Sequence, residues 1–526
     1  MEQIYYGGTI LTLEHKRQVE AVLVRDGRVA AIGSPELLHA SAPGAAMRSL
    51  EGRTLLPAFI DPHSHLSAVA NSFLQIPLDE AVSVEEIRTA LTDFVQRNHV
   101  PVGTWVIAKG YDHNVLPGGR HITRDFLDHC LPEHPVIVQH RSGHSGVCNS
   151  LALKKLGITI ATAAPEGGVI GQKNGRLTGF LEENAFMTYM KRVPMPDLKA
   201  MQAAFDKAQT LYASHGITTV QDGMVVREML PMYRYLYEQR ALRLDLVSYP
   251  DTATLDEMIE RFPHSVGQYD RHIRIGGIKT FLDGSPQGRT AWMRTPYLDS
   301  EDDYGYGTLS DEALDAAIEK ANAHSMQLLA HCNGDAAAAQ YLAALTRAES
   351  TCPSLRDARP VMIHAQLLDL DQLAAVRATG VIPSFFVAHV YHWGDIHRKN
   401  FGEARAARIS PAMSAWRAGI LFTFHQDAPV IPPDMLETLW CATCRTTKSG
   451  FVLGEKERLP VEEALYAVTR NAAYQYFEEE TKGAIRVGAR ADFVVLDRNP
   501  LAVPPEELRT LRVLATIKDG VVVYAQ

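Results

Sequence analysis

The sequence Phe59-Ile-Asp-Pro-His-Ser-His-Leu66 places a His-x-His pair at the end of an apolar run. Residues 55–57 before it are also apolar, which is typical of a buried strand. The side-chain period of two in a strand turns His63 and His65 to the same face. Two neutral imidazoles that converge suit zinc, which accepts histidine nitrogens. The alternative is a structural pair, because so short a motif is weak evidence without further ligands.

The composition is that of a folded globular protein. The 526 residues are 46% hydrophobic and 21% charged, which is enough for one large core and a second, smaller one. The 52 basic and 61 acidic residues give a formal net charge of -9 and form no long run of one sign. We therefore expect neither nucleic acid nor an anionic membrane surface as a partner.

The cysteines lack the pattern of a disulfide framework. Thiols in a chain of this length are typical of a reducing compartment, so the cytoplasm is the expected location. The sequence indicates neither a signal peptide nor an apolar run of membrane-spanning length. A Cys441-x-x-Cys444 spacing without a second pair favours a structural role over metal binding. The six cysteines are Cys130, Cys148, Cys332, Cys352, Cys441 and Cys444.

Short alternating strand patterns occupy both ends of the chain. Residues 1–56 and 483–526 carry such runs, which are broken by turn signals such as Asp26-Gly27 and Asp519-Gly520. Because small sheets bury a face poorly alone, these ends are expected to pack together. We predict a composite β-sandwich domain, with residues 57–482 inserted between its halves.

The middle of the chain predicts an α/β fold of the (β/α)8 TIM-barrel type. Eight apolar runs end in polar residues, and most are followed by helical patterns such as 311–324. This alternation favours parallel strands that close into a barrel, with functional residues at the carboxyl ends of the strands. The eight runs are residues 55–65, 217–222, 242–249, 273–283, 326–331, 361–364, 381–389 and 420–427.

The segment from about 67 to 215, after the first barrel strand, is too long for a connecting loop. It has a helical pattern at 84–98 and strand patterns at 105–109 and 136–139. We predict an inserted α/β subdomain, and its position suggests a lid that shapes a substrate pocket.

Further metal-ligand candidates end other barrel strands. His331 ends the fifth strand, His364 the sixth and Asp427 the eighth. Any one histidine here could be a hydrogen-bonded core residue, because a buried imidazole needs only one or two partners. A barrel, however, brings strand ends together, so the set favours a metal site.

Lys279 lies within the apolar fourth strand, where a bare ammonium would be costly. One interpretation is an ion pair with Asp283 or Asp427. The other is that burial favours the neutral amine, which can react with carbon dioxide. The resulting carbamate has two oxygens that could bridge two cations, so the sequence favours a dinuclear site.

These segments together resemble the amidohydrolase superfamily, and within it the amidohydrolase-3 branch related to N-substituted formamide deformylases. The resemblance covers essentially the whole chain. Its motifs are Pro57-Ala-Phe-Ile-Asp-Pro-His-Ser-His65, Gly216-Ile-Thr-Thr-Val-Gln-Asp-Gly223, Ile278-Lys-Thr-Phe-Leu-Asp-Gly-Ser285, His331-Cys-Asn-Gly-Asp335, Ile363-His-Ala-Gln366, Asp427-Ala-Pro-Val430 and the segment 483–496.

The resemblance implies two divalent metal ions and a small-molecule substrate. One ion would bind His63, His65 and Asp427, the other His331 and His364, with carboxylated Lys279 between them. Zinc is the expected metal, with iron, manganese or cobalt as alternatives. Metal-bound hydroxide would attack an amide, N-formyl or cyclic amide carbonyl, and Asp427 would transfer the proton to the leaving amine. A homodimer is compatible with the family.

Several other residues are candidates for a role in the site. His425, two residues before Asp427, is interpreted either as a partner that holds the Asp427 carboxylate or as a filler of the barrel interior. Asp112 and Arg289 have a solvated salt-bridging role as their alternative. The candidates for substrate contact are His144, His389, His392, Trp393, Asp112 and Arg289.

Two other functions remain open from the sequence. A deaminase would use one metal without the bridging lysine, so Lys279 argues against it. A non-catalytic metal-binding protein would be favoured by a missing ligand, and none of the expected ligands is missing. The sequence does not identify the substrate, because the fold is shared by many chemistries.

Overall fold

The computed structural model describes residues 2–14, 18–142, 144–194, 197–351 and 353–526. The chain divides into two compact units. The larger unit comprises Met1–Ser67 and Ala208–Gln526, and the inserted unit comprises Ala68–Lys207. None of the described helices is both long and apolar enough to cross a membrane.

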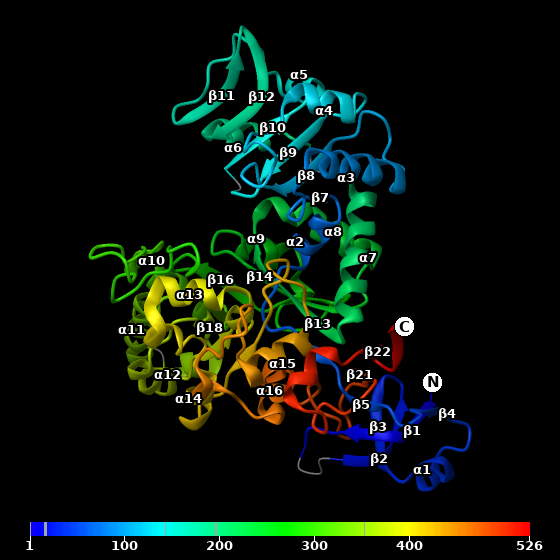
Figure 1. Ribbon diagram of the computed structural model, residues 1–526. Coiled ribbons are helices and arrows are strands. Elements are labelled where there is room, and N and C mark those ends of the chain that lie inside the picture. Colours follow the sequence, from blue (N-terminus) through cyan, green and yellow to red (C-terminus); the bar gives the residue numbers. More distant parts are fainter. Residues whose placement is uncertain (1, 15–17, 143, 195–196, 352) are drawn as a thin grey trace. The chain divides into compact units, whose positions relative to one another are not determined.

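Strands from both chain ends pair into one sheet of the larger unit, seen in Figure 1 where β21 and β22 (red) lie beside β5 and β1 (blue). Its order is β23-β22-β21-β5-β1-β2-β3, with β4 also paired to β1. The pairing therefore gives a single continuous sheet, and it does not resolve the two sheets of the predicted sandwich. The strands are β1 (Glu2–Leu11), β2 (Gln18–Arg25), β3 (Arg28–Gly33), β4 (Ala46–Ser49), β5 (Thr54–Pro57), β21 (Phe493–Leu496), β22 (Val513–Lys518) and β23 (Val521–Ala525).

A buried ion network joins this terminal sheet to the rest of the larger unit. Asp245 at the start of β14 (Asp245–Pro250) accepts from Lys482 Nζ at 2.7 Å and from Lys518 Nζ of β22 at 3.0 Å. Lys482 also pairs with Glu478 at 2.7 Å. Buried charges persist only when they are paired, so this network fixes the two parts against each other.

The remaining strands of the larger unit are parallel and follow chain order. One sheet runs β6-β13-β14-β15 and the other β16-β17-β18-β19-β20, so each of the eight predicted runs contains a strand. Besides β14, they are β6 (Phe59–Ile60), β13 (Ile217–Val225), β15 (Ile273–Ile275), β16 (Gly277–Phe281), β17 (Gln327–Cys332), β18 (Val361–His364), β19 (Ile382–Phe385) and β20 (Thr423–Phe424).

The fourth predicted run is divided at Gly276 into β15 and β16. The Gly276 amide donates to Ser248 O of β14 at 3.0 Å, which keeps the two sheets adjacent. A Cβ at this position would lie 2.7 Å from the Tyr249 ring, so only glycine fits this approach.

The prediction of a closed barrel is not supported by strand pairing. Among the described residues no ladder joins β20 to β6, and both strands are only two residues long. A single backbone bond, from His65 N to Ala428 O at 3.0 Å, lies between the segments that follow them. The observed α/β architecture is a run of parallel strands of the kind found in barrel hydrolases.

Helices connect and cover these strands. They are α8 (Leu230–Gln239), α9 (Leu255–Arg261), α10 (Asp311–Ala323), α11 (Asp335–Thr351), α12 (Leu373–Thr379), α13 (His389–Ala406), α14 (Ala412–Arg417), α15 (Met435–Cys444), α16 (Val461–Ala467) and α17 (Arg470–Gln475), with α1 (Pro35–Ser41) beside the terminal sheet. Cys441 and Cys444 of α15 are buried free thiols, in agreement with a structural role. Cys352 lies outside the described residues.

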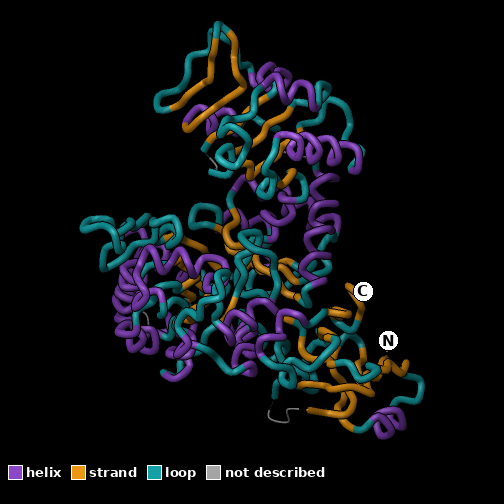
Figure 2. Tube along the Cα trace, viewed as in Figure 1, coloured by secondary structure: helices purple, strands orange, loops and turns teal. Residues whose placement is uncertain are grey.

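The inserted unit has its own six-stranded sheet, in the order β11-β12-β10-β9-β8-β7. The β11–β12 hairpin is visible as the two long orange segments in Figure 2. The strands are β7 (Ile76–Pro77), β8 (Val106–Tyr111), β9 (Val136–His140), β10 (Ser145–Cys148), β11 (Gly168–Lys173) and β12 (Arg176–Glu183). The helices are α3 (Val84–Arg97), α4 (Arg124–Cys130), α5 (Ser150–Leu156) and α6 (Asn184–Met190), and α2 (Leu66–Ser72) and α7 (Leu198–Ser214) connect to the larger unit.

Candidate functional site

Two histidines and an aspartate converge where β6 and β20 end. The Asp427 Oδ1 atom lies 3.3 Å from His63 Nε2 and 3.1 Å from His65 Nε2. Lys279 reaches the same point from β16, and its Nζ lies 3.3 Å from His63 Nε2. Residues separated by more than 360 positions in the chain therefore share one site.

The other two candidate ligands complete this cluster. His331 is the penultimate residue of β17, and His364 is the last residue of β18. The His364 Nε2 atom lies 3.1 Å from His331 Nδ1 and 4.0 Å from Asp427 Oδ2. All six residues predicted as metal ligands thus meet at the carboxyl ends of the strands.

The donor atoms fit a metal ion. Ligand atoms bound to tetrahedral zinc at its usual distances lie about 3.3 Å from one another. The spacings within the cluster are similar, and one donor atom each from His63, His364 and Asp427 lies within 4.8 Å of the others. The mixture of imidazole and carboxylate is the donor set that zinc and related divalent ions accept.

The imidazoles of His63, His331 and His364 are held neutral, as binding to a metal ion requires. Burial, assisted by the nearby Lys279, lowers the pKa of His63 to about 4 and that of His331 to about 3. Burial and the neighbouring His331 also hold the pKa of His364 well below its ordinary value. Their ring nitrogens are therefore free to bind a cation at neutral pH.

Lys279 is buried, and burial lowers its pKa to about 7 even though the Asp427 carboxylate acts in the opposite direction. No ion pair links it to a carboxylate among the described residues, so the sequence alternative of a pair with Asp283 or Asp427 is not observed. Asp283 instead accepts from the backbone amides of Asn333, Gly334 and Trp292, a bonding pattern that fixes the loop after β17.

Asp427 is ionised despite its burial. Burial alone would raise its pKa, but the adjacent His63 and His65 imidazoles outweigh that effect and hold the pKa well below the ordinary value. The backbone at His364 (φ 72°) and at Asp427 (φ 54°) adopts the left-handed conformation. Such a conformation costs a non-glycine residue about 1–3 kcal/mol, and it is typical of functional sites.

Gln221 of β13 is a site residue that was not predicted. Its Oε1 accepts a hydrogen bond from His63 Nδ1 at 2.6 Å, and its Nε2 donates to Pro62 O at 2.7 Å and to Tyr476 OH at 2.9 Å. The amide is thereby fixed in one orientation, and it leaves His63 Nε2 for a metal. A buried amide within an apolar run was the available signal.

His425 contacts His364, whereas the sequence left open either a partner of the Asp427 carboxylate or a filler of the barrel interior. The His425 Nε2 atom lies 3.1 Å from His364 Nδ1, and its Nδ1 lies 3.0 Å from Ser384 Oγ. With His364 Nε2 directed at the cluster, its Nδ1–H donates to His425, which in turn donates to Ser384. This chain orients His364.

Four of the candidates for substrate contact belong to the larger unit, and three of these lie together at the start of one helix. His389, His392 and Trp393 begin α13, directly after β19. His389 bonds to His397 at 3.0 Å, and His392 Nε2 pairs with Glu437 at 2.8 Å. Arg289 pairs with Asp303 at 2.9 Å and stacks on Tyr297, which supports its salt-bridging alternative.

His144 and Asp112 belong to the inserted unit. His144 Nδ1 lies 3.1 Å from Glu183, and Asp112 pairs with Arg141 at 3.2 Å. Their roles as substrate contacts stay predictions.

A second group of potential ligands comprises Asp112, His113 and His140. The Ser142 amide donates to His140 Nδ1 at 3.1 Å, so the proton of this neutral ring resides on Nε2. That nitrogen lies 3.1 Å from His113 Nδ1 and donates to it. The His113 and His140 imidazoles are thus joined by a hydrogen bond within the inserted unit.

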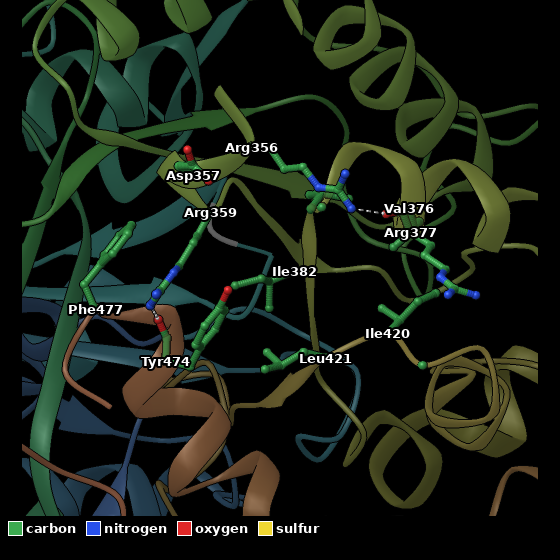
Figure 3. Close-up of a pocket in the computed structure, with 13 residues that line it drawn as sticks. Arg356, Asp357, Arg359, Val376, Arg377, Ile382, Ile420, Leu421, Tyr474 and Phe477 are labelled. Atoms are coloured by element: carbon green, nitrogen blue, oxygen red, sulfur yellow. Dashed lines mark hydrogen bonds between the residues drawn. The ribbon is translucent and has the colours of Figure 1, made fainter. Parts of the chain in front are cut away.

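A cavity of about 570 Å³ lies at the other, amino ends of β19 and β20 (Figure 3). It is lined by Arg356, Arg359, Arg377, Tyr474 and apolar side chains. Arg359 stacks on Tyr474 and pairs with Glu479 at 2.6 Å, so its charge is already neutralised. None of the candidate ligands lines this cavity, and we assign the functional site to the carboxyl ends.

The sequence matches the amidohydrolase family over residues 47–524. The chain belongs to the amidohydrolase family. The match confirms the resemblance that the motifs predicted, and it identifies this amidohydrolase as a metal-dependent hydrolase of carbon–nitrogen bonds.

Three proteins that are similar to this chain are consistent with the family assignment. The amidohydrolase is 30% identical to YtcJ of Bacillus subtilis (strain 168), which is named as an amidohydrolase, over 100% of this chain and 99% of that protein. It is 28% identical to an N-substituted formamide deformylase of Arthrobacter pascens, over 96% and 95% of the two chains. An uncharacterized metal-dependent hydrolase from Pyrococcus furiosus superposes with a TM-score of 0.79 at 25% identity, over 95% of this chain and 100% of that chain.

Proposed function

We propose that this amidohydrolase binds two divalent metal ions and hydrolyses the C–N bond of an amide, N-formyl or cyclic amide substrate. The observation that carries the proposal is the position of Lys279, whose buried amine lies 3.3 Å from the ligating nitrogen of His63. A lysine at this place has no structural partner among the described carboxylates. Its placement between the two groups of candidate ligands supports a bridging role.

In this proposal His63, His65 and Asp427 hold one ion, and His331 and His364 hold the other. The neutral Lys279 amine would add carbon dioxide and release one proton, and the resulting carbamate would supply a further anionic ligand between the two groups of residues. Zinc is the proposed metal, because the donors are imidazole nitrogens and carboxylate oxygens. Bound ions would lower the pKa of a coordinated water toward neutrality and polarise the substrate carbonyl.

Asp427 performs the proton transfer. Its ionised carboxylate accepts the proton that the attacking water loses, while the water oxygen bonds to the carbonyl carbon. Asp427 then gives that proton to the leaving nitrogen as the C–N bond breaks, so the products are a carboxylic acid and an amine. Its Oδ1 atom lies 3.3 Å from His63 Nε2 and 3.1 Å from His65 Nε2, so the three residues could share one ion.

The N-formyl class is one proposed substrate group. It is supported by the similarity to the N-substituted formamide deformylase of Arthrobacter pascens, at 28% identity over nearly the whole length of both chains. Cyclic and N-acyl amides share the same scissile bond, and a substrate panel should include them.

The decisive experiment measures metal content and amide hydrolysis together. We expect about two equivalents of zinc per chain in the wild type, and loss of the second equivalent and of activity in Lys279→Ala. Lys320→Ala is the matched control, because this lysine pairs with Asp256 away from the site. Two metals retained in Lys279→Ala would contradict the carbamate bridge. One metal in the wild type, with ammonia released from a cyclic substrate, would favour a deaminase.

A further inference from the structure

Phe281 is an exposed aromatic side chain beside the metal-ligand cluster. It is the last residue of β16, two positions after Lys279, so the two side chains point to the same face of the strand. In the ladder between β16 and β17 it pairs in register with His331, and the two rings lie 4.9 Å apart. The phenyl ring therefore adjoins two of the six candidate ligands.

The Phe281 ring is not part of the buried hydrophobic core. Phe281 is 37% exposed, whereas Lys279 on the same strand is buried. An exposed phenyl group loses the stabilisation of about 1.5–3 kcal/mol that full burial provides. A scattered exposed apolar residue is common on protein surfaces, but one at the carboxyl end of a barrel strand adjoins the reacting groups.

A second exposed apolar residue lies in the turn that follows β20 and contains the candidate ligand Asp427. Val430 follows Asp427 by three positions, and its amide donates to Asp427 O at 2.9 Å. Its side chain is 50% exposed. The turn that begins at Asp427 thus also exposes an isopropyl group three residues after this candidate ligand.

We propose that Phe281 and Val430 determine specificity by contacting an apolar substituent of the substrate amide. This inference rests on the proposed function, because it takes the scissile bond to lie over the ligand cluster. Substrates with an extended alkyl or aryl group on the nitrogen or acyl side would cover Phe281, while a methyl group would leave it in water. The favoured class is an apolar N-substituted amide.

The test compares N-hexylformamide with N-methylformamide for the wild type and Phe281→Ala, both loaded with zinc. We expect the ratio of kcat/KM for hexyl over methyl to fall about tenfold in Phe281→Ala, since partial burial of a phenyl ring corresponds to about one factor of ten in affinity. A smaller fall is expected for Val430→Ala, and metal content should stay unchanged.

Phe477→Ala is the matched control, because Phe477 is 42% exposed and lines the cavity at the amino ends of the strands. It should leave the hexyl-to-methyl ratio at the wild-type value. An unchanged ratio in Phe281→Ala, or the same change in Phe477→Ala, would overturn the proposal.

A binding measurement separates this inference from the proposed reaction. Calorimetry with nonan-2-one and butan-2-one, in which a methylene group replaces the amide nitrogen of the hexyl and methyl amides, reports the contact without turnover because these ketones have no C–N bond to cleave. Selective loss of hexyl binding in Phe281→Ala supports the contact even if no amide is hydrolysed, in which case the proposed reaction fails alone. Equal binding of both analogues by the wild type overturns the contact.

Discussion

His63 Nδ1 donates a hydrogen bond of 2.6 Å to Gln221 Oε1, and this bond determines which nitrogen of the histidine faces the cluster. The Gln221 amide cannot rotate away, because its Nε2 donates to Pro62 O and Tyr476 OH. The orientation of a strand-end ligand is thus controlled from the neighbouring strand β13.

Gln221→Leu should weaken metal binding by roughly 10–100-fold, the usual effect of removing a partner that orients a ligating histidine. The expected change is in the zinc dissociation constant, measured by competition with a chelating dye. Gln209→Leu is the control, since Gln209 is a buried glutamine of α7 that bonds to Ala241 O away from the ligands. An unaltered zinc affinity in Gln221→Leu would show that His63 is oriented by its packing alone.

Lys482→Met should destabilise the larger unit by about 3–5 kcal/mol, because it leaves Asp245 and Glu478 buried with less compensating charge. The midpoint of urea unfolding measures this loss. Lys320→Met removes a partly exposed pair with Asp256 and should cost less than about 1 kcal/mol. Equal midpoints for the two variants would mean that the buried network contributes no more than a surface pair.

The His397 imidazole makes the stability depend on pH. Burial lowers its pKa to about 3, whereas a histidine in the unfolded chain titrates near 6.5. As the pH falls from 6.5 toward 3, the unfolded state binds a proton that the folded state excludes, so stability present above pH 6.5 is lost on the order of a few kcal/mol.

His397→Gln should therefore flatten the fall in urea midpoint between pH 7.5 and pH 4.5. His39→Gln, at an exposed histidine of α1, should leave the wild-type slope unchanged. Parallel profiles for wild type and His397→Gln would exclude this histidine as the source of the acid sensitivity.

The strands, and the clustering of the candidate ligands at their ends, were predictable from the sequence because they leave local signals. A buried parallel strand is an apolar run, and a polar residue that ends it, such as His331 or His364, stands out against that run. Lys279 was recognisable for the same reason, since an ammonium within an apolar strand conflicts with its surroundings.

Closure of the strands and the arrangement of the terminal sheet were not predictable in this way. Pairing between β6 and β20 depends on segments of two residues each at opposite ends of the barrel sequence, and periodicity says nothing about their register. Likewise, the alternating patterns at the chain ends identify strands without specifying whether they form one sheet or two.

The hydrogen-bond partners of the candidate ligands could not be predicted from the sequence either. The partner of His425 could be His364 or Asp427 on spacing alone, because a side chain two residues from an aspartate faces the same side. Only the distance of 3.1 Å between His425 Nε2 and His364 Nδ1 distinguishes them. The buried Gln221 amide stood out within its strand, but its partner His63 lies 158 positions away, and nothing local in the sequence specifies that pairing.

The missing ladder between β20 and β6 gives the candidate ligands a mechanical role. His63 and His65 follow one of these strands and Asp427 follows the other, so a shared metal ion would join the first and last strands at a place where the backbone contributes the bond from His65 N to Ala428 O. Chelation should then loosen this junction before the rest of the larger unit, and amide exchange should accelerate first in residues 59–66 and 423–430. The bound cation would then contribute both to catalysis and to the stability of the junction between the two strand ends.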